Sequence, residues 1–366
     1  MVIMVAPAIG PVIGGLLTSD FSWRAVFYIN LPFGALAFIG ALFFLPETKS
    51  TSHGRLDWLG FGMLSLSIGA LQILLDRGTN QDWFSSREII VETVITGTAF
   101  YLFLSHICTT QKPFIRPALF ANRSFTAATI LVTGAGITSF AALSLQPPFL
   151  QGLANEPIVT AGLVMGPRGV GTFVAVLLTG RLIGKVDNRI ILLAGLSLSA
   201  WAFDMMTGWT QNVSTQTIMV TGLIQGFGTG AIIVPLTTLA LSAISPEHRP
   251  EASSVFTLAR TIGSSLGVSI VNSMFTENVQ INHAEIAGAV TAFNRQLAPP
   301  HIAAFWSPFT ANGRAALDAV ITQQAQIISY NDDYKLLMIL SLISIPLLFI
   351  IGKPKPQPDP SKLAVE

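Results

Sequence analysis

Ten stretches of mainly apolar residues follow one another along the chain, and short segments with charges or turn residues separate them. A helix needs about 20 such residues to cross the hydrocarbon of a bilayer, where only helices and closed barrels satisfy their backbone groups. Charged residues make up 11% of the chain, whereas soluble proteins contain about 25%. The sequence predicts an all-α membrane protein with spans near 1–18, 24–46, 57–75, 88–108, 124–146, 159–183, 190–209, 217–244, 252–276 and 334–352.

Lysine and arginine concentrate in alternate loops, namely 47–56, 109–123, 181–189, 245–251 and 353–366. Cytoplasmic loops carry an excess of these residues. The C-terminus is therefore predicted to be cytoplasmic, in a multi-pass protein of the plasma (inner) membrane. The long polar segment 277–333 is predicted to be an extracytoplasmic loop with an amphipathic or hairpin-like surface element.

Composition excludes several classes of function. The formal net charge of +1 indicates no nucleic-acid partner. The single Cys108 excludes an intramolecular disulfide and a cysteine metal cluster. No metal-binding His/Glu spacing and no Walker motif for ATP occur. The sequence thus predicts no metal or cofactor.

Small residues and prolines characterise the first apolar stretch. Ala6, Gly10 and Gly14 are spaced by four and share one helix face, which lets a second backbone approach closely. Pro7 and Pro11 lack amide hydrogens and so bend or loosen the helix. The pattern predicts a kinked, tightly packed transmembrane helix.

This stretch and the segment from Trp23 to Gly34 resemble the major facilitator superfamily, and within it the 14-helix drug:proton antiporters of the EmrB/QacA type. The resemblance assigns Gly10, Pro11, Gly14 and Gly15 to the antiporter motif of the fifth helix. It implies a helical bundle of about ten spans that is N-terminally truncated and lacks the first four helices.

The resemblance also implies a domain organisation. The expected units are a remnant of the N-terminal six-helix bundle (1–46), an inserted helix pair (47–110), the C-terminal six-helix bundle (111–352) and a disordered cytoplasmic tail (353–366).

Polar residues within the predicted spans are candidates for the transport site, because charge inside a membrane helix is expensive. Arg168 follows Gly162, Gly166 and Pro167, in a run that matches a cavity-lining helix of the family. It is either a cavity cation or a structural arginine bonded to carbonyl groups of neighbouring helices. Two residues with amide side chains, Gln225 and Asn272, are further cavity candidates. The alternative role for Gln225 is an interhelical hydrogen bond.

Glycine repeats and basic residues suggest helix packing and gating. Gly222, Gly226 and Gly230 repeat every four residues and predict a helix that is packed along its length. Arg260, beside Gly263 and Gly267, resembles a family motif and is expected to have a structural or gating role.

The segment 180–189 resembles a cytoplasmic loop motif of the superfamily, and its gating candidates are Gly180, Arg181, Asp187 and Arg189. These residues either latch onto neighbouring helix ends or form a solvated loop. Asp204 is a weaker candidate for proton coupling, because burial of its carboxyl group would favour protonation.

The resemblance implies a secondary active exporter of amphipathic, often cationic compounds, driven by protons through alternating access in the lipid bilayer. Such a cargo crosses without chemical change, so the protein is predicted not to be an enzyme. The family residues most tied to proton coupling lie in the helices that this sequence lacks. Two alternatives therefore remain. In the first alternative to the exporter, the chain is a truncated fragment that does not transport. In the second, it is an inner-membrane component that docks a periplasmic adaptor protein through the outer loop.

Overall fold

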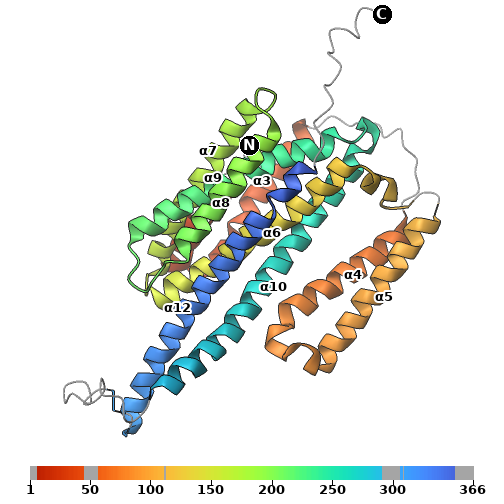
Figure 1. Cartoon of the computed structure of the whole chain (residues 1–366). Coiled ribbons are helices and arrows are strands. Elements are labelled where there is room, and N and C mark those ends of the chain that lie inside the picture. The colour runs from red at the N-terminus through yellow and green to blue at the C-terminus, as the bar shows by residue number, and fades with distance from the viewer. Residues whose placement is uncertain (1–5, 45–56, 111–112, 291–305, 308, 351–366) are drawn as a thin grey trace, which may run out of the picture.

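The computed structural model describes residues 6–44, 57–110, 113–290, 306–307 and 309–350. These residues are almost entirely helical, and none of them belongs to a β-strand (Figure 1). Eight of their helical stretches are long and apolar enough to cross a membrane. The prediction of an all-α membrane protein is confirmed.

The helices lie close to the predicted spans, with two exceptions at the C-terminal end. The first eight predicted spans agree with the observed helices to within a few residues. The long helices are α1 (Ala6–Asp20), α3 (Asn30–Phe44, after the short α2, Ala25–Tyr28), α4 (Trp58–Arg77), α5 (Arg87–Thr109), α6 (Arg123–Pro148), α7 (Ile158–Leu182), α8 (Asn188–Met206), α9 (Thr215–Ser242), α10 (Arg249–Ala289) and α12 (Ala311–Ile343).

The last two helices correct the prediction of a polar loop over 277–333. Helix α10 continues to Ala289, and α12 already begins at Ala311, well before the predicted start at 334. The 41 residues of α10 give a length of about 60 Å at 1.5 Å per residue, about twice the thickness of bilayer hydrocarbon.

Polar side chains join α10 and α12 along this segment. Asn282 Nδ2 donates to Ser329 Oγ over 3.3 Å, and His283 Nε2 lies 2.9 Å from Asp318 Oδ1. The polar residues pair across two adjacent helices instead of interrupting them. The pair extends beyond the neighbouring helices as an arm (Figure 1).

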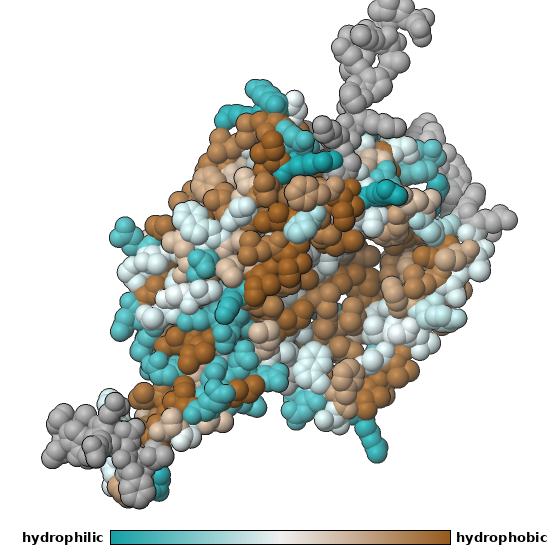
Figure 2. Space-filling model, viewed as in Figure 1, coloured by the Kyte–Doolittle hydropathy of each residue, from teal (hydrophilic) through white to brown (hydrophobic). Residues whose placement is uncertain are grey.

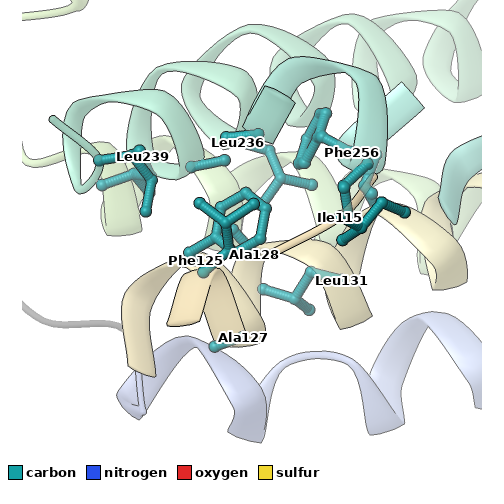
Figure 3. Packing of buried hydrophobic residues seen from close by; sticks show 14 of the residues in the cluster. Ile115, Phe125, Ala127, Ala128, Leu131, Leu236, Leu239 and Phe256 are labelled. Carbon is teal, nitrogen blue, oxygen red and sulfur yellow. The ribbon is translucent and has the colours of Figure 1, made fainter. Parts of the chain in front are cut away.

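Helices α6 to α10 and α12 pack into one bundle, with α7 and α8 against α9, α6 against α10, and α12 against α8 and α10. One buried cluster combines Phe125, Leu236 and Phe256, from α6, α9 and α10 (Figure 3). A second cluster surrounds Phe149 and Trp209.

Helix α1 packs against α7, but not through the predicted face of Ala6, Gly10 and Gly14. A Cβ atom added to Gly15 would lie 3.0 Å from the carbonyl oxygen of Ile158, whereas Gly10 and Gly14 meet no described atom within 4 Å. The shared face of Gly10 and Gly14 is therefore not the contact between α1 and α7. The side chain of Pro11 lies outside the described residues.

The exposed surface is apolar where a bilayer would cover it. Helices α2 and α3 contain no buried residue, although α3 is composed almost entirely of apolar residues. Figure 2 shows a broad hydrophobic band across the middle of the visible face, with hydrophilic residues gathered towards its two ends. This distribution is the one expected of helices that face lipid.

Helices α4 and α5 form a hairpin beside α10 (Figure 1), and Asp57 anchors its base. Asp57 Oδ1 accepts from the Gly60 N–H (2.9 Å) and Oδ2 from the Phe114 N–H (3.1 Å), and His106 Nε2 lies 3.0 Å from both oxygens. Burial raises the pKa of the Asp57 carboxyl group, but hydrogen bonds from Gly60, His106 and Phe114 outweigh burial and lower the pKa below its ordinary value.

We expect Asp57→Ala to lower the free energy of unfolding by about 2 kcal/mol, because it removes a helix cap and a bond to each of two further segments. A carboxyl group with a lowered folded pKa stabilises the fold above its unfolded pKa, and this contribution is lost as the pH falls through the folded value. Thermal unfolding of the purified protein, measured near neutral pH and at a pH well below the usual pKa of an aspartate side chain, tests both effects.

Asp57→Asn is the matched control, because asparagine caps helices as well as aspartate does but carries no charge. It should retain part of the stability and lose the pH dependence assigned to Asp57. An Asp57→Ala protein with the wild-type unfolding midpoint would contradict this role.

Candidate functional site

Glycines bring α7 and α9 into direct backbone contact around Arg168. A Cβ atom on Gly226 would overlap the carbonyl oxygen of Arg168 and lie 2.8 Å from its carbonyl carbon. One turn further, a Cβ atom on Gly230 would lie 2.5 Å from the carbonyl oxygen of Thr172. The glycine repeat on α9 thus packs against α7, as the sequence predicts, and it fixes the backbone that carries Arg168.

A second glycine contact joins α6 and α10. A Cβ atom on Gly136 would lie 2.5 Å from the carbonyl oxygen of Arg260, and Gly263 and Gly267 meet the backbone of Thr133 and Ile137 just as closely. The backbone of Arg260 therefore belongs to a packed interface, and its side chain is half-buried. This location is compatible with the predicted structural or gating role.

The half-buried side chain of Arg168 combines features of both predicted roles. Its Nη2 donates to the carbonyl oxygen of Ser139 on α6 over 2.8 Å, as a structural arginine would. Its Nη1 is buried, and among the described residues it has no hydrogen-bond partner. One end of the guanidinium group therefore joins two helices, while the other end is available to a further group.

Helix α12 places three polar side chains in the core of the bundle, where the sequence analysis expected none. Tyr330, Asp333 and Tyr334 are buried, and Asp333 is 0% exposed. Neither carboxylate oxygen of Asp333 has a hydrogen-bond partner among the described residues, and the Tyr334 hydroxyl group also lacks one. Buried polar groups are rarely left unpaired without a functional reason.

Aromatic rings from four segments surround these groups in a continuous series. The ring centroids are 4.4 Å apart for Phe275 and Tyr330, 5.4 Å for Tyr330 and Phe149, 5.3 Å for Phe149 and Trp209, and 5.5 Å for Trp209 and Tyr334. Together with Arg168 and Asp333, these five rings form what we call the polar–aromatic centre.

Tyr334 connects the two charged residues of the centre. It interacts electrostatically with Arg168 and also with Asp333 and Tyr330. Among the described residues, however, no ion pair within 4 Å joins Arg168 to Asp333. The centre thus contains a half-buried cation and a buried carboxyl group that do not neutralise each other directly.

A groove of about 440 Å³ lies between α4 and α10, and it reaches the edge of the centre. Asn272, a predicted cavity residue, is exposed there. Asp76, Phe140 and Phe275 also line the groove, and the Phe275 ring packs against Tyr330. Asn272 therefore lies in the groove, whereas Arg168 belongs to the polar–aromatic centre.

Gln225 and Asp204 differ in how well the structure fits their predicted roles. Gln225 on α9 is 1% exposed, and its Oε1 has no partner among the described residues. Asp204 is exposed on α8, while its neighbours Phe203 and Met206 occupy the buried face. Asp204 therefore does not lie inside the bundle, and its role in proton coupling stays a prediction.

The segment 180–189 forms a tight connection between α7 and α8. Gly184 has a φ of 86°, which favours glycine, and Asp187 caps α8 by accepting from the Arg189 N–H over 3.0 Å. Gly180 and Arg181 are exposed. The contact shown for Asp187 is thus with its own helix, and a gating role for the segment stays a prediction.

Tyr330 and Asp333 were assigned to the predicted loop 277–333, and Tyr334 to the first position of the predicted span 334–352, so none of the three was predicted to be a site residue. A helical signal was present, since Ile327, Tyr330, Tyr334 and Leu337 follow a spacing of three or four residues. Among the described residues, no cluster of three or more His, Cys, Asp or Glu residues offers a metal site.

Comparisons with known proteins agree with this architecture. Residues 1–280 match the family model of the Major Facilitator Superfamily. The multidrug export protein EmrB of Escherichia coli (strain K12) is 31% identical over 367 residues, which cover 97% of this chain and 70% of EmrB. The fatty acid resistance protein FarB of Neisseria gonorrhoeae is 28% identical over 358 residues, with the same coverage of the two chains.

A solved structure shows a similar fold. It is the crystal structure of a bacterial homolog of the human lysosomal transporter Spinster, in an inward-facing and unoccupied conformation. The TM-score is 0.51 at 16% sequence identity, over 98% of this chain and 71% of the other.

Proposed function

Because the chain belongs to the Major Facilitator Superfamily, we propose that it is a proton-coupled exporter of amphipathic, often cationic compounds. It is a multi-pass membrane protein of a transporter family. Relatives that are named as multidrug export and fatty acid resistance proteins support a cargo with a large apolar part. The charge distribution of the loops supports a cytoplasmic C-terminus in the inner membrane.

The observation that carries the proposal is the polar–aromatic centre. Ionisable residues inside membrane helices are costly, and those that persist typically mark the path of a substrate or a proton. The centre holds Arg168 and Asp333 in the interior of the bundle, together with aromatic rings that suit an amphipathic cation. Its position in the packed bundle supports alternating access around this region.

The glycine contacts support movement between helices. At Gly226 and Gly263 the backbones of adjacent helices touch without intervening side chains. Such surfaces are smooth enough for small shifts of packed helices. The comparisons favour neither a fragment without transport activity nor a component that docks an adaptor protein.

Transport into proteoliposomes tests this function. The purified chain is reconstituted into vesicles that enclose DNA and have an acidic interior, and ethidium entry is followed by its fluorescence on the DNA. An antiporter exchanges outgoing protons for incoming ethidium, so uptake should exceed that of vesicles without a pH gradient. A protonophore should abolish the difference, and equal uptake under all conditions would contradict proton coupling.

A further inference from the structure

The Asp333 carboxyl group is the least compensated polar group in the polar–aromatic centre. It is 0% exposed, and both of its oxygen atoms lack hydrogen-bond donors among the described residues. A buried carboxylate without a partner is destabilising by several kcal/mol. Two changes relieve this cost: the carboxyl group binds a proton, or a cation enters and pairs with the carboxylate.

The neighbouring groups do not supply a fixed partner. The Asp332 carboxylate on the same helix repels a negative charge at Asp333. Tyr330 also lies on this helix, and its hydroxyl group carries no positive charge that could pair with Asp333. Tyr334 interacts electrostatically with both Asp333 and Arg168. The Arg168 guanidinium group is held by the Ser139 carbonyl oxygen over 2.8 Å. The described residues therefore leave room for a mobile positive charge at Asp333.

Phe275 contacts both the polar–aromatic centre and an exposed groove. Its ring packs against Tyr330 with centroids 4.4 Å apart, and Tyr330 precedes Asp333 by three residues, close to one helical turn. Phe275 also lines the groove between α4 and α10, in which Asp76 and Asn272 are exposed. An acidic side chain attracts cations to this groove, and aromatic faces stabilise them.

We propose that Asp333 is the carboxyl group at which this transporter exchanges a proton for a lipophilic cation, which arrives from the groove past the Phe275 ring. The inference rests on the proposed export function and assigns its exchange residue. When the cation enters, the protonated carboxyl group releases its proton to water in the groove, and the resulting carboxylate pairs with the cation. The O–H bond of the acid is the only covalent bond that breaks. The net charge of the centre does not change, because the cation replaces the proton.

Labelling with dicyclohexylcarbodiimide tests the assignment without any transport measurement. This apolar reagent modifies protonated carboxyl groups in apolar surroundings. The purified full chain is treated in detergent, and peptide mass spectrometry locates the adduct. We expect an adduct on Asp333 that decreases as the pH rises, because only the protonated form reacts. Tetraphenylphosphonium, a lipophilic cation, should suppress it.

Matched variants separate Asp333 from its neighbour. Asp332→Asn changes the adjacent, half-buried carboxyl group and should leave the labelling of Asp333 intact, whereas Asp333→Asn should abolish it. Phe275→Ala removes the ring between the groove and Tyr330, so the reagent should reach Asp333 faster and labelling should accelerate. The wild-type protein provides the main result, so a folding defect in a variant does not obscure it.

Two results would overturn the assignment: an adduct on Asp332 instead of Asp333, or labelling of Asp333 that tetraphenylphosphonium does not affect. Either result leaves proton-driven ethidium uptake into proteoliposomes unchanged. Conversely, a failure of proton-driven uptake contradicts the export function. It does not change the labelling of Asp333, which is measured without transport.

Discussion

Substitution of Gly226 by alanine is expected to lower the free energy of unfolding by about 3 kcal/mol, at the upper end of the range for overpacking a core. The new methyl group would overlap the Arg168 carbonyl oxygen and lie 3.0 Å from the backbone nitrogen of Thr172. Backbone atoms of a helix cannot rotate out of the way as a side chain does. Helices α7 and α9 must therefore separate along their contact.

Gly97→Ala on α5 is the matched control, because a Cβ atom there meets nothing within 4 Å. Alanine is favoured over glycine in a helix by about 1 kcal/mol, so this variant should be as stable as the wild type or slightly more stable. Both are compared by thermal unfolding in the same detergent. Equal midpoints for Gly226→Ala and Gly97→Ala would show that α7 and α9 do not pack through this glycine.

Replacement of Arg168 by alanine is expected to reduce ethidium transport about tenfold, which corresponds to about 1.4 kcal/mol and lies near the value of a hydrogen bond to a charged group. The substitution removes the bond from Nη2 to the Ser139 carbonyl oxygen and the buried Nη1 that has no partner. The first loss loosens α7 from α6, and the second removes the cation of the polar–aromatic centre.

Two variants define what the Arg168 result means. Arg87→Ala changes an exposed arginine at the start of α5, and it should transport like the wild type. Arg168→Lys retains the charge but not the planar fork of donors, so it should recover part of the activity. Efflux from cells, normalised to the amount of protein in the membrane, measures all three. Unchanged efflux by Arg168→Ala would remove this residue from the mechanism.

The sequence predicted most helices well, because span length and glycine spacing are local properties. Helix α9 was expected to pack along its length from Gly222, Gly226 and Gly230 alone, and the backbone of α7 lies against this repeat. The same reasoning could not select the right glycine on α1. Which of Gly10, Gly14 and Gly15 contacts another helix depends on how α1 is rotated against α7.

Burial of charge was the property that the sequence did not predict. Asp204 and Asp333 both lie in helices with apolar neighbours, yet one is exposed and the other is completely buried. The difference arises because Phe203 and Met206 occupy the inner face of α8, whereas Asp333 shares the inner face of α12 with Tyr330 and Leu337. Only the packing of the surrounding helices determines these faces.

The arm formed by the ends of α10 and α12 offers a direct way to observe the transport cycle. Its two helices are tied by Asn282 to Ser329 and by His283 to Asp318, so they should turn as one lever with the bundle. A small rotation at the membrane is then magnified at the far end, in proportion to the length of the arm. Spin labels at that end would report the turning of the bundle as a change in distance, with no probe in the substrate path.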